Sequence, residues 1–400
     1  MQEVCIMNTV GIICEYNPYH LGHSWHIGQT RSALGDDTAV VCVMSGNYVQ
    51  RGDLAVFNKH ARAKMAILNG ADLVIELPTP YALLSAGGFA RAGVYILSRL
   101  GACDYISFGS ESGNISELRN AANAIASDEA QRHIRFWLGR GLPYASALQS
   151  AAGAVLGAKA DVFKSPNNLL AIEYIRAIDE CGSLLRPMTV RRVGGKHDTD
   201  TGYSASSLRK TLLKGSMPLS HMPGAAVAVC MEEIVSGRGP VFIKDVEQAI
   251  LSRLRMLGDF SMIPDATEGL ENRFMRFASE GTSIDSILNM VKTKRYAMSR
   301  LRRMLMCAAL GIKAEDTAIP PPYIRILATN GKGMELLKAV NKKNMLPVIT
   351  KPASVKKLSG AALRLFSLEA AATDLYALAY TKEEERTGGW EWRQSPVIIK

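Results

Sequence analysis

The chain lacks several features that would assign it to a class of protein at once. No run of 18 or more apolar residues occurs, so we expect no transmembrane helix and no membrane partner. The N-terminus has neither the basic nor the apolar segment of a secretory signal, and we expect none. The seven cysteines are scattered without a Cys-x-x-Cys pair, which indicates neither a zinc site nor a disulfide framework. Free thiols are typical of a reducing compartment, and we expect a cytoplasmic protein.

The net charge is absent from one half of the chain and concentrated in the other. The 400 residues are 48% hydrophobic and 21% charged, which predicts a globular chain of two domains. Residues 1–204 hold 18 basic and 18 acidic residues, whereas residues 205–400 hold 29 and 19. A basic second half favours a polyanionic partner such as RNA; the alternative is a solvated surface without a partner. The basic stretches are Lys292–Arg295, Arg300–Arg303, Lys342–Lys343 and Lys356–Lys357.

The first two hundred residues alternate apolar runs with helical patterns. We predict strands at Val10–Cys14, Ala39–Met44, Leu73–Leu77, Tyr105–Gly109 and Met188–Val193, with helices between them. This order predicts an α/β fold with a parallel, Rossmann-like sheet. From about residue 205 helical patterns dominate, apart from a mixed patch at Pro320–Ala328, and Gly215 and Pro218 mark a boundary. We therefore predict a nucleotide-binding domain over 1–215 and a basic, mainly α-helical domain over 216–400.

The first predicted strand is followed by a pattern that indicates a phosphate site. Asn17 and Pro18 form a turn signal, and His20, Gly22 and His23 open a helix. A helix N-terminus presents free N–H groups to phosphate, and a glycine allows close approach. His20 and His23 lie three apart and share one face, from which they can donate hydrogen bonds to a developing charge.

A second set of residues is expected to lie across the crevice from this site. Ser204, Ser206 and Arg209 lie at a helix start, and we expect them to form a second phosphate cradle facing His20. Arg191 and Arg192 end the fifth strand, so at most one faces the crevice.

Three further features have two interpretations each. The polar loop after the second strand is expected to contact a second substrate, or else to be a surface loop with an internal Arg51–Asp53 pair. Its candidate contact residues are Ser45, Gly46, Asn47, Gln50 and Arg51. Lys59, Arg62 and Lys64 either stabilise phosphate or are solvated helix charges. Asn168 is expected to cap the helix that follows it. The alternative for the neighbouring Asn167 is a contact with a ribose or an adenine. Lys196, His197 and Asp198 are expected to support Arg192.

These motifs resemble the nucleotidyltransferase superfamily that shares the His-x-Gly-His motif with class I aminoacyl-tRNA synthetases. Ser204, Ser206 and Arg209 take the positions of its second phosphate motif, although Ala205 stands where many members carry serine. Within that superfamily, four motifs in order resemble the bacterial tRNA(Met) cytidine acetate ligase family. They are Gly11–His23, Met44–Gly52, Asn69–Pro78 and Phe108–Glu111. The resemblance continues through Leu346–Lys351 and Ala372–Ala377 and so covers nearly the whole chain.

The resemblance implies a reaction and a set of ligands. It implies an ATP-dependent ligase that forms acetyl-adenylate from acetate and then acetylates N4 of the wobble cytidine of elongator tRNA(Met). ATP, with Mg²⁺ carried by the nucleotide, acetate and this tRNA are the expected ligands, and no protein partner is expected. The family's ATP contacts fall on Val10, Gly11, Ile12, Ile13, Cys14, Glu15, Tyr16, Asn17, Pro18, Tyr19, His20, Leu21, Gly22, His23, Gly109, Asn167 and Arg192.

The expected catalytic residues are His20, His23 and Arg209, with Ser206 among the nucleotide contacts. They would stabilise charge on the α-phosphate and on the departing pyrophosphate. No metal ligand of the protein itself is expected. Two alternatives are a nucleotidyltransferase of cofactor biosynthesis and an RNA-binding protein without activity. The first gives no reason for a basic second half, and the intact histidine motif argues against the second.

Overall fold

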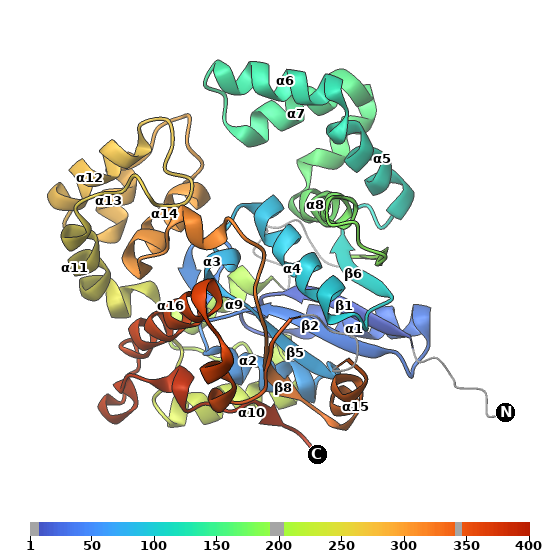
Figure 1. Ribbon diagram of the computed structural model, residues 1–400, viewed down its shortest axis with the longest axis vertical. Coiled ribbons are helices and arrows are strands. Elements are labelled where there is room, and N and C mark those ends of the chain that lie inside the picture. The colour runs from blue at the N-terminus through green and yellow to red at the C-terminus, as the bar shows by residue number, and fades with distance from the viewer. Residues whose placement is uncertain (1–7, 193–203, 341–345) are drawn as a thin grey trace.

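A computed structural model of the chain describes residues 8–192, 204–340 and 346–400 (Figure 1). Within these residues eight strands form one sheet: seven follow the order β10-β8-β5-β2-β1-β6-β7, and β9 also pairs with β8. A two-stranded hairpin, β3 with β4, stands apart. The strands are β1 (Thr9–Cys14), β2 (Ala39–Ser45), β3 (Tyr48–Val49), β4 (Asp53–Leu54), β5 (Leu73–Leu77), β6 (Tyr105–Ser110), β7 (Arg186–Arg191), β8 (Ile324–Thr329), β9 (Val348–Ile349) and β10 (Val397–Ile398).

The five strands from β5 to β7 are parallel, whereas β8 runs antiparallel to β5. All five strands predicted in the first half are present, with bounds that differ by at most two residues. The predicted α/β fold with a parallel sheet is therefore confirmed.

Helices cover both faces of the sheet and build a separate lobe (Figure 1). The helices are α1 (Leu21–Leu34), α2 (Lys59–Leu68), α3 (Thr79–Ala82), α4 (Ala86–Leu100), α5 (Ile115–Ala126), α6 (Asp128–Gly139), α7 (Tyr144–Leu156), α8 (Pro166–Glu180), α9 (Ala205–Leu213), α10 (Gly224–Val235), α11 (Glu247–Leu257), α12 (Leu270–Glu280), α13 (Ile284–Val291), α14 (Met298–Leu310), α15 (Gly331–Val340) and α16 (Gly360–Ala377). Short 3₁₀ turns join several of them.

The alternation of side chains along the strands produces the two cores beside the sheet. In β2, Val41 and Val43 belong to the core that contains residues of α4 and α8. Cys42 and Met44, which face the opposite way, belong to the core that contains residues of α2 and α10. Strands buried on both faces read as continuous apolar runs, which is why β2 was recognisable from the sequence.

The second half of the chain contributes both to the sheet and to the separate lobe. Helices α11 to α14 enclose their own hydrophobic core, which also takes in the end of α16. Strands β8 and β10, however, extend the sheet that begins with β1. The sheet therefore contains strands from both sides of the boundary expected near residue 215. That the first half binds the nucleotide and the second half binds RNA stays a prediction.

A buried cluster of charges attaches the C-terminal segment to the sheet. Lys59 Nζ, on α2, lies 2.5 Å from Glu76 Oε1 of β5 and 2.5 Å from Glu391 Oε1. Its distance to Glu369 Oε2 of α16 is 3.7 Å. Arg325 of β8 contacts Glu391 and lies 3.6 Å from Glu76. All five side chains are at most 4% exposed, so they depend on protein partners rather than on water. Thr79 also donates to Glu369, and Thr373 donates to Glu391.

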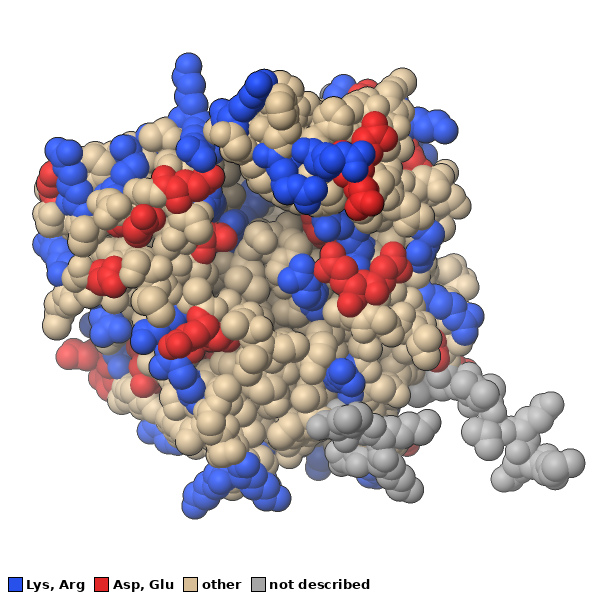
Figure 2. All heavy atoms as spheres, turned by 45° about the horizontal axis from the view of Figure 1, so that its top comes forward, with Lys and Arg blue, Asp and Glu red and all other residues tan. Residues whose placement is uncertain are grey.

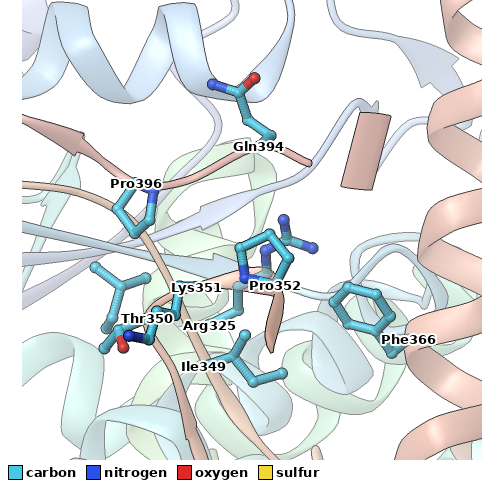
Figure 3. A pocket seen from close by; sticks show the side chains of 9 residues that line it. Arg325, Ile349, Thr350, Lys351, Pro352, Phe366, Gln394 and Pro396 are labelled. Carbon is cyan, nitrogen blue, oxygen red and sulfur yellow. The ribbon is translucent and has the colours of Figure 1, made fainter. Parts of the chain in front are cut away.

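A small hollow opens beside this cluster (Figure 3). Arg325, Phe366 and Pro352 line it, with Gln394 at one side. Because β5 and β2 separate β8 from β1, this hollow is not part of the predicted nucleotide site.

Candidate active site

The predicted nucleotide site lies where the strand order of the sheet reverses. β1 has β2 on one side and β6 on the other, and the chain leaving β1 leads into α1. In sheets of this kind ligands bind outside the carboxyl ends of the strands at such a point. The turn from Tyr16 to His20 and the N-terminus of α1 lie there. The predicted order of strand, turn and helix is confirmed.

Two histidines fix the start of α1. His20 is the N-cap residue, and its Nδ1 accepts the N–H of Gly22 at 3.0 Å. Nδ1 of His23 accepts the N–H of His20 at 3.2 Å, and the two rings stack with centroids 3.7 Å apart. A ring nitrogen that accepts a hydrogen bond carries no proton, so each neutral ring keeps its proton on Nε2. Each histidine therefore has an Nε2–H donor to offer a ligand.

Burial keeps these rings neutral. Burial, followed by the charges of Arg192 and Arg209, lowers the pKa of His20 to about 4. Burial and then the proximity of His20 lower the pKa of His23 well below its usual value. Burial, followed by Arg192, likewise lowers the pKa of His26 to about 4. Near neutral pH the histidines are thus uncharged donors, and the positive charge of the site comes from the two arginines.

The remaining residues of the predicted ATP segment form the strand and the turn that lead to this site. Val10 to Cys14 form β1, and Gly11 leaves room for the side chain of Leu97, which a β-carbon would strike. A cis peptide bond joins Asn17 to Pro18. The rings of Tyr16 and Tyr19 lie 4.7 and 5.4 Å from that of His23, by centroid. Leu21 and Gly22 are exposed in the first turn of α1.

Arg192 lies over the end of β6. A β-carbon on Gly109 would be 3.3 Å from Cγ of Arg192, so the glycine lets the arginine pack against the strand end. Arg191 lies against Gly113 instead, where a β-carbon would be 2.7 Å from Cβ of the arginine. Arg192, and not Arg191, lowers the pKa of the histidines, in agreement with the alternation expected at a strand end.

The second predicted phosphate motif meets the first. Nη1 of Arg209 donates to the carbonyl oxygen of Asn17 at 2.8 Å, across 192 positions of sequence. Ser204 is the N-cap of α9, and its Oγ accepts the N–H of Ser207 at 3.2 Å. Ser206 is half-buried in the first turn. The structure therefore brings Arg209 to the turn that precedes His20.

A carboxylate links the loop after β6 to the start of α8. Oε1 of Glu111 accepts from Nδ2 of Asn167 at 2.6 Å, and Oε2 accepts the N–H of Asn168 at 2.9 Å. In return, Oδ1 of Asn168 accepts the N–H groups of Glu111 and Ser112 at 3.0 Å. The predicted capping by Asn168 is wrong, because Ser165 holds the N-cap position and the amide of Asn168 points to the neighbouring loop.

The polar loop after β2 is more buried than the sequence suggests. Ser45, Gly46 and Asn47 are all buried. A β-carbon on Gly46 would lie 2.7 Å from Oε1 of Glu76, and Oδ1 of Asn47 accepts the N–H of Lys59 at 2.9 Å. Gly46 and Asn47 thus pack the loop against the buried charge cluster, and the contact of these three residues with a substrate stays a prediction.

The outer part of this loop connects the site to the helical lobe. The N–H of Gln50 donates to Oε1 of Glu15 at 2.7 Å, and Arg51 is exposed. A β-carbon on Gly52 would lie 2.5 Å from the backbone of Arg302 in α14. Among the described residues Arg51 makes no ion pair with Asp53, so the expected internal pair is wrong. Gln50 and Arg51 remain candidates for substrate contacts.

Two of the three cations on α2 have roles that the sequence did not predict. Lys59 belongs to the buried cluster, and the fully buried Arg62 donates to the carbonyl oxygens of Phe57 at 2.9 Å and Ser45 at 3.1 Å. Lys59 and Arg62 neither bind phosphate nor lie in solvent, because both side chains are buried and are held by protein groups. Lys64 pairs with Glu232 at 2.6 Å near the surface.

Sequence reasoning missed one residue that the structure places at the site. Nε2 of His26 lies 2.9 Å from Oγ of Ser107, which also bonds Thr30 at 2.8 Å, so His26 fastens α1 to β6. Its position three residues after His23, on the same helical face, was a usable signal. Residues 196–198, predicted to support Arg192, lie outside the described residues.

Neither a membrane-spanning helix nor a cluster of metal ligands is found in the described ranges. None of the helices in residues 8–192, 204–340 and 346–400 is long and apolar enough to span a membrane. The same ranges contain no group of three or more His, Cys, Asp and Glu side chains arranged to hold a metal ion.

Comparison with protein families gives a match over most of the chain. The model described as HIGH Nucleotidyl Transferase matches residues 7–389. The tRNA(Met) cytidine acetate ligase of Caldicellulosiruptor saccharolyticus is 38% identical over 403 residues, covering 98% of this chain and 99% of the relative. The enzyme of the same name from Acetivibrio thermocellus is 36% identical over 420 residues, covering 98% and 100%.

Comparison with solved structures agrees. The crystal structure of Thermotoga maritima TmcAL bound with alpha-thio ATP superimposes with a TM-score of 0.90 at 32% identity. It covers 98% of this chain and 100% of that one. The apo form of the same protein gives a TM-score of 0.91 at 31% identity, with the same coverage.

Proposed function

Since the chain belongs to the HIGH nucleotidyltransferase family and, within it, to the tRNA(Met) cytidine acetate ligases, we propose that it activates acetate with ATP and acetylates a tRNA cytidine. The tRNA is elongator tRNA(Met), and the acceptor is N4 of its wobble cytidine. One observation supports the first step above all others. Two neutral histidines, each with its proton on Nε2, lie at a helix N-terminus at the switch point of the sheet, and the charges of Arg192 and Arg209 act on His20.

The first step forms acetyl-adenylate. An acetate oxygen attacks the α-phosphorus of ATP, the bond to the bridging oxygen breaks, and pyrophosphate leaves with the electron pair. Negative charge grows on the α-phosphate oxygens and on the leaving group. Neutral N–H donors stabilise such charge without losing a proton, and fixed donors need no reorganisation. We assign His20 and His23 to this role.

The arginines supply the charge that the histidines lack. Arg192 lies at the end of β6 and Arg209 at the turn before α1, so the nucleotide phosphates would lie between them. Gly109 and Gly22 have no side chain, which leaves room for Arg192 at one edge of this space and for the ring of His20 at the other. Mg²⁺ carried on the phosphates would neutralise the leaving pyrophosphate.

The second step transfers the acetyl group. N4 of the cytidine attacks the carbonyl carbon of acetyl-adenylate, AMP leaves, and one proton is lost from the amine. No covalent enzyme intermediate is needed. The wobble base must leave the anticodon stack to reach the mixed anhydride.

The basic second half is the proposed main binding surface for tRNA, with fewer available charges than the sequence suggests. Arg295 and Arg300 bind Glu268 at 2.7 and 3.1 Å, and Arg303 lies 3.2 Å from Asp265. These arginines therefore hold the loop between α11 and α12.

Exposed cations on the same lobe remain for phosphate. They include Lys292 and Lys294.

The test is acetate-dependent exchange of labelled pyrophosphate into ATP, followed by nucleoside analysis of tRNA incubated with the protein. We expect exchange with acetate and N4-acetylcytidine at the wobble position of tRNA(Met). A tRNA whose wobble cytidine is replaced by uridine is the matched control, because it keeps the backbone but lacks the N4 amine. Exchange with a different metabolite and no modified tRNA would refute the proposal and favour a cofactor-forming nucleotidyltransferase.

A further inference from the structure

A stretch of the first half is basic although that half as a whole is neutral. Residues 130–160, which include most of α6 and all of α7, contain no Asp or Glu and four cations: Arg132, Arg135, Arg140 and Lys159. The acidic residues of α6, Asp128 and Glu129, are confined to its first turn. Summing charge over the whole half hides this local excess.

Three of these cations share one exposed face. Arg135 and Phe136 lie three and four residues after Arg132, and Arg140, the C-cap residue, lies four residues after Phe136, so the four residues line one side of α6. All four are exposed, and none of the three arginines makes an ion pair in the described part of the chain.

Neighbouring cations behave differently. Arg119 lies 3.7 Å from Asp179, Lys164 lies 2.6 Å from Asp161, and Arg176 lies 3.2 Å from Glu173. The three arginines of the α6 face thus differ from these neighbours, which are paired with acidic side chains.

An aromatic side chain lies in the middle of this face. Phe136 is 49% exposed, and Cζ of Arg140 lies 4.1 Å from its ring centroid. The ring of Trp137 meets that of Phe136 edge-on, with centroids 5.2 Å apart. Exposed aromatic rings and guanidinium planes are the groups on which unstacked bases of single-stranded RNA stack, while the flanking charges bind phosphate.

The position of α6 fits a role beside the site. Helices α5 to α7 are inserted between β6 and α8, and both ends of the insertion meet at the active-site edge, where Glu111 bonds Asn167 and Asn168. Across from them stand α11 to α14, which touch the site through Gly52 (Figure 1). Figure 2 shows that the surface between these two groups of helices is hollowed and that Lys and Arg side chains lie on both rims.

We propose that the exposed face of α6, formed by Arg132, Arg135, Phe136 and Arg140, binds the anticodon arm of the tRNA opposite the α11–α14 lobe. The arm then lies in the hollow, with its backbone against both rims and an unstacked loop base on Phe136. This inference rests on the proposed function, since it names a surface for the same RNA substrate.

Two variants test the proposal. The first is the triple variant Arg132→Gln, Arg135→Gln, Arg140→Gln; the second is Phe136→Ala. The matched control is Arg119→Gln, which removes an exposed arginine of the same insertion that is already paired. The measurements are the Kd for tRNA(Met) at several salt concentrations, the rate of tRNA acetylation, and Tm.

We expect the triple variant to bind tRNA at least tenfold more weakly, with a salt slope that is smaller by about two to three, since each lost phosphate contact lowers it by about 0.7–0.9. Phe136→Ala should weaken binding roughly 5- to 100-fold by loss of one stacked base. The control should bind as wild type. Hydrogen exchange on the wild type should show that tRNA protects residues 128–144.

The outcomes separate this proposal from the proposed function. Acetylation by the wild type together with unchanged Kd and salt slope in both variants would overturn the role of α6 alone. The absence of both acetate-dependent exchange and acetylation in the wild type would refute the proposed function instead. If either variant lowers Tm, the hydrogen-exchange result decides, and no protection at residues 128–144 would overturn the proposal.

Discussion

His20 has two roles in the structure, and two substitutions separate them. Its Nδ1 caps α1 by accepting the N–H of Gly22 at 3.0 Å, and its Nε2–H is a donor for phosphate. Asparagine is among the best N-cap residues and accepts the same bond, but it has no group at the position of Nε2. His20→Asn therefore keeps the cap and removes the donor, whereas His20→Ala removes both.

The magnitudes of the two roles are different enough to be told apart. Loss of an N-cap costs about 1 kcal/mol, which amounts to about a fivefold change in an equilibrium. Loss of one fixed donor to a transition-state charge costs about 100- to 1000-fold in rate. We expect both variants to lose that much of the kcat for acetate-dependent pyrophosphate exchange. Only His20→Ala should also lower Tm, by about 1 °C for a chain of this length.

The assay combines exchange kinetics at saturating ATP with thermal unfolding of both variants. If His20→Asn retained more than about a fifth of the wild-type kcat while His20→Ala lost most of it, the histidine would act by capping alone. The assignment of His20 as a phosphate donor would then be wrong. Equal Tm values for the two variants would refute the capping role.

Three further predictions concern charge. Arg192→Gln should raise the pKa of His20 from about 4 toward its usual value, detectable by NMR titration, and should raise the KM for ATP; an unchanged titration would refute the contact. Against the effect of burial, Lys59 and Arg325 lower the pKa of Glu391 to about 2. Glu391→Gln should therefore lower the free energy of unfolding, measured with urea, by about 3–5 kcal/mol. Burial, followed by the charge of Glu76, raises the pKa of Glu369 to about 8, so this side chain is mostly protonated at pH 7. Glu369→Gln, which is also uncharged, should lower the free energy of unfolding by less than about 1 kcal/mol at that pH. Because folded Glu369 binds a proton that the unfolded chain releases, its effect on stability declines as pH rises from about 4.5 to about 8, and Glu369→Gln should remove that decline from the curve of Tm against pH.

The sequence determined the local order of the active site. An apolar strand, a turn and a helix with histidines three apart can be read without a structure because strand burial, turn chemistry and helical spacing all act over a few residues. The parallel direction of β1, β2, β5, β6 and β7 was predicted from the same local patterns, whereas their order in the sheet was not. The family followed from several such motifs in order.

Only the tertiary structure decided which polar residues are buried together. Lys59 and Arg325 meet Glu76, Glu369 and Glu391 from elements up to 332 positions apart, and none of these residues has a local pattern that predicts its partner. Likewise, Arg300 and Arg303 belong to a basic stretch in the sequence but bind carboxylates of a neighbouring loop in space. Charge is counted along the chain, whereas its compensation depends on distances across the fold, which the sequence by itself leaves open.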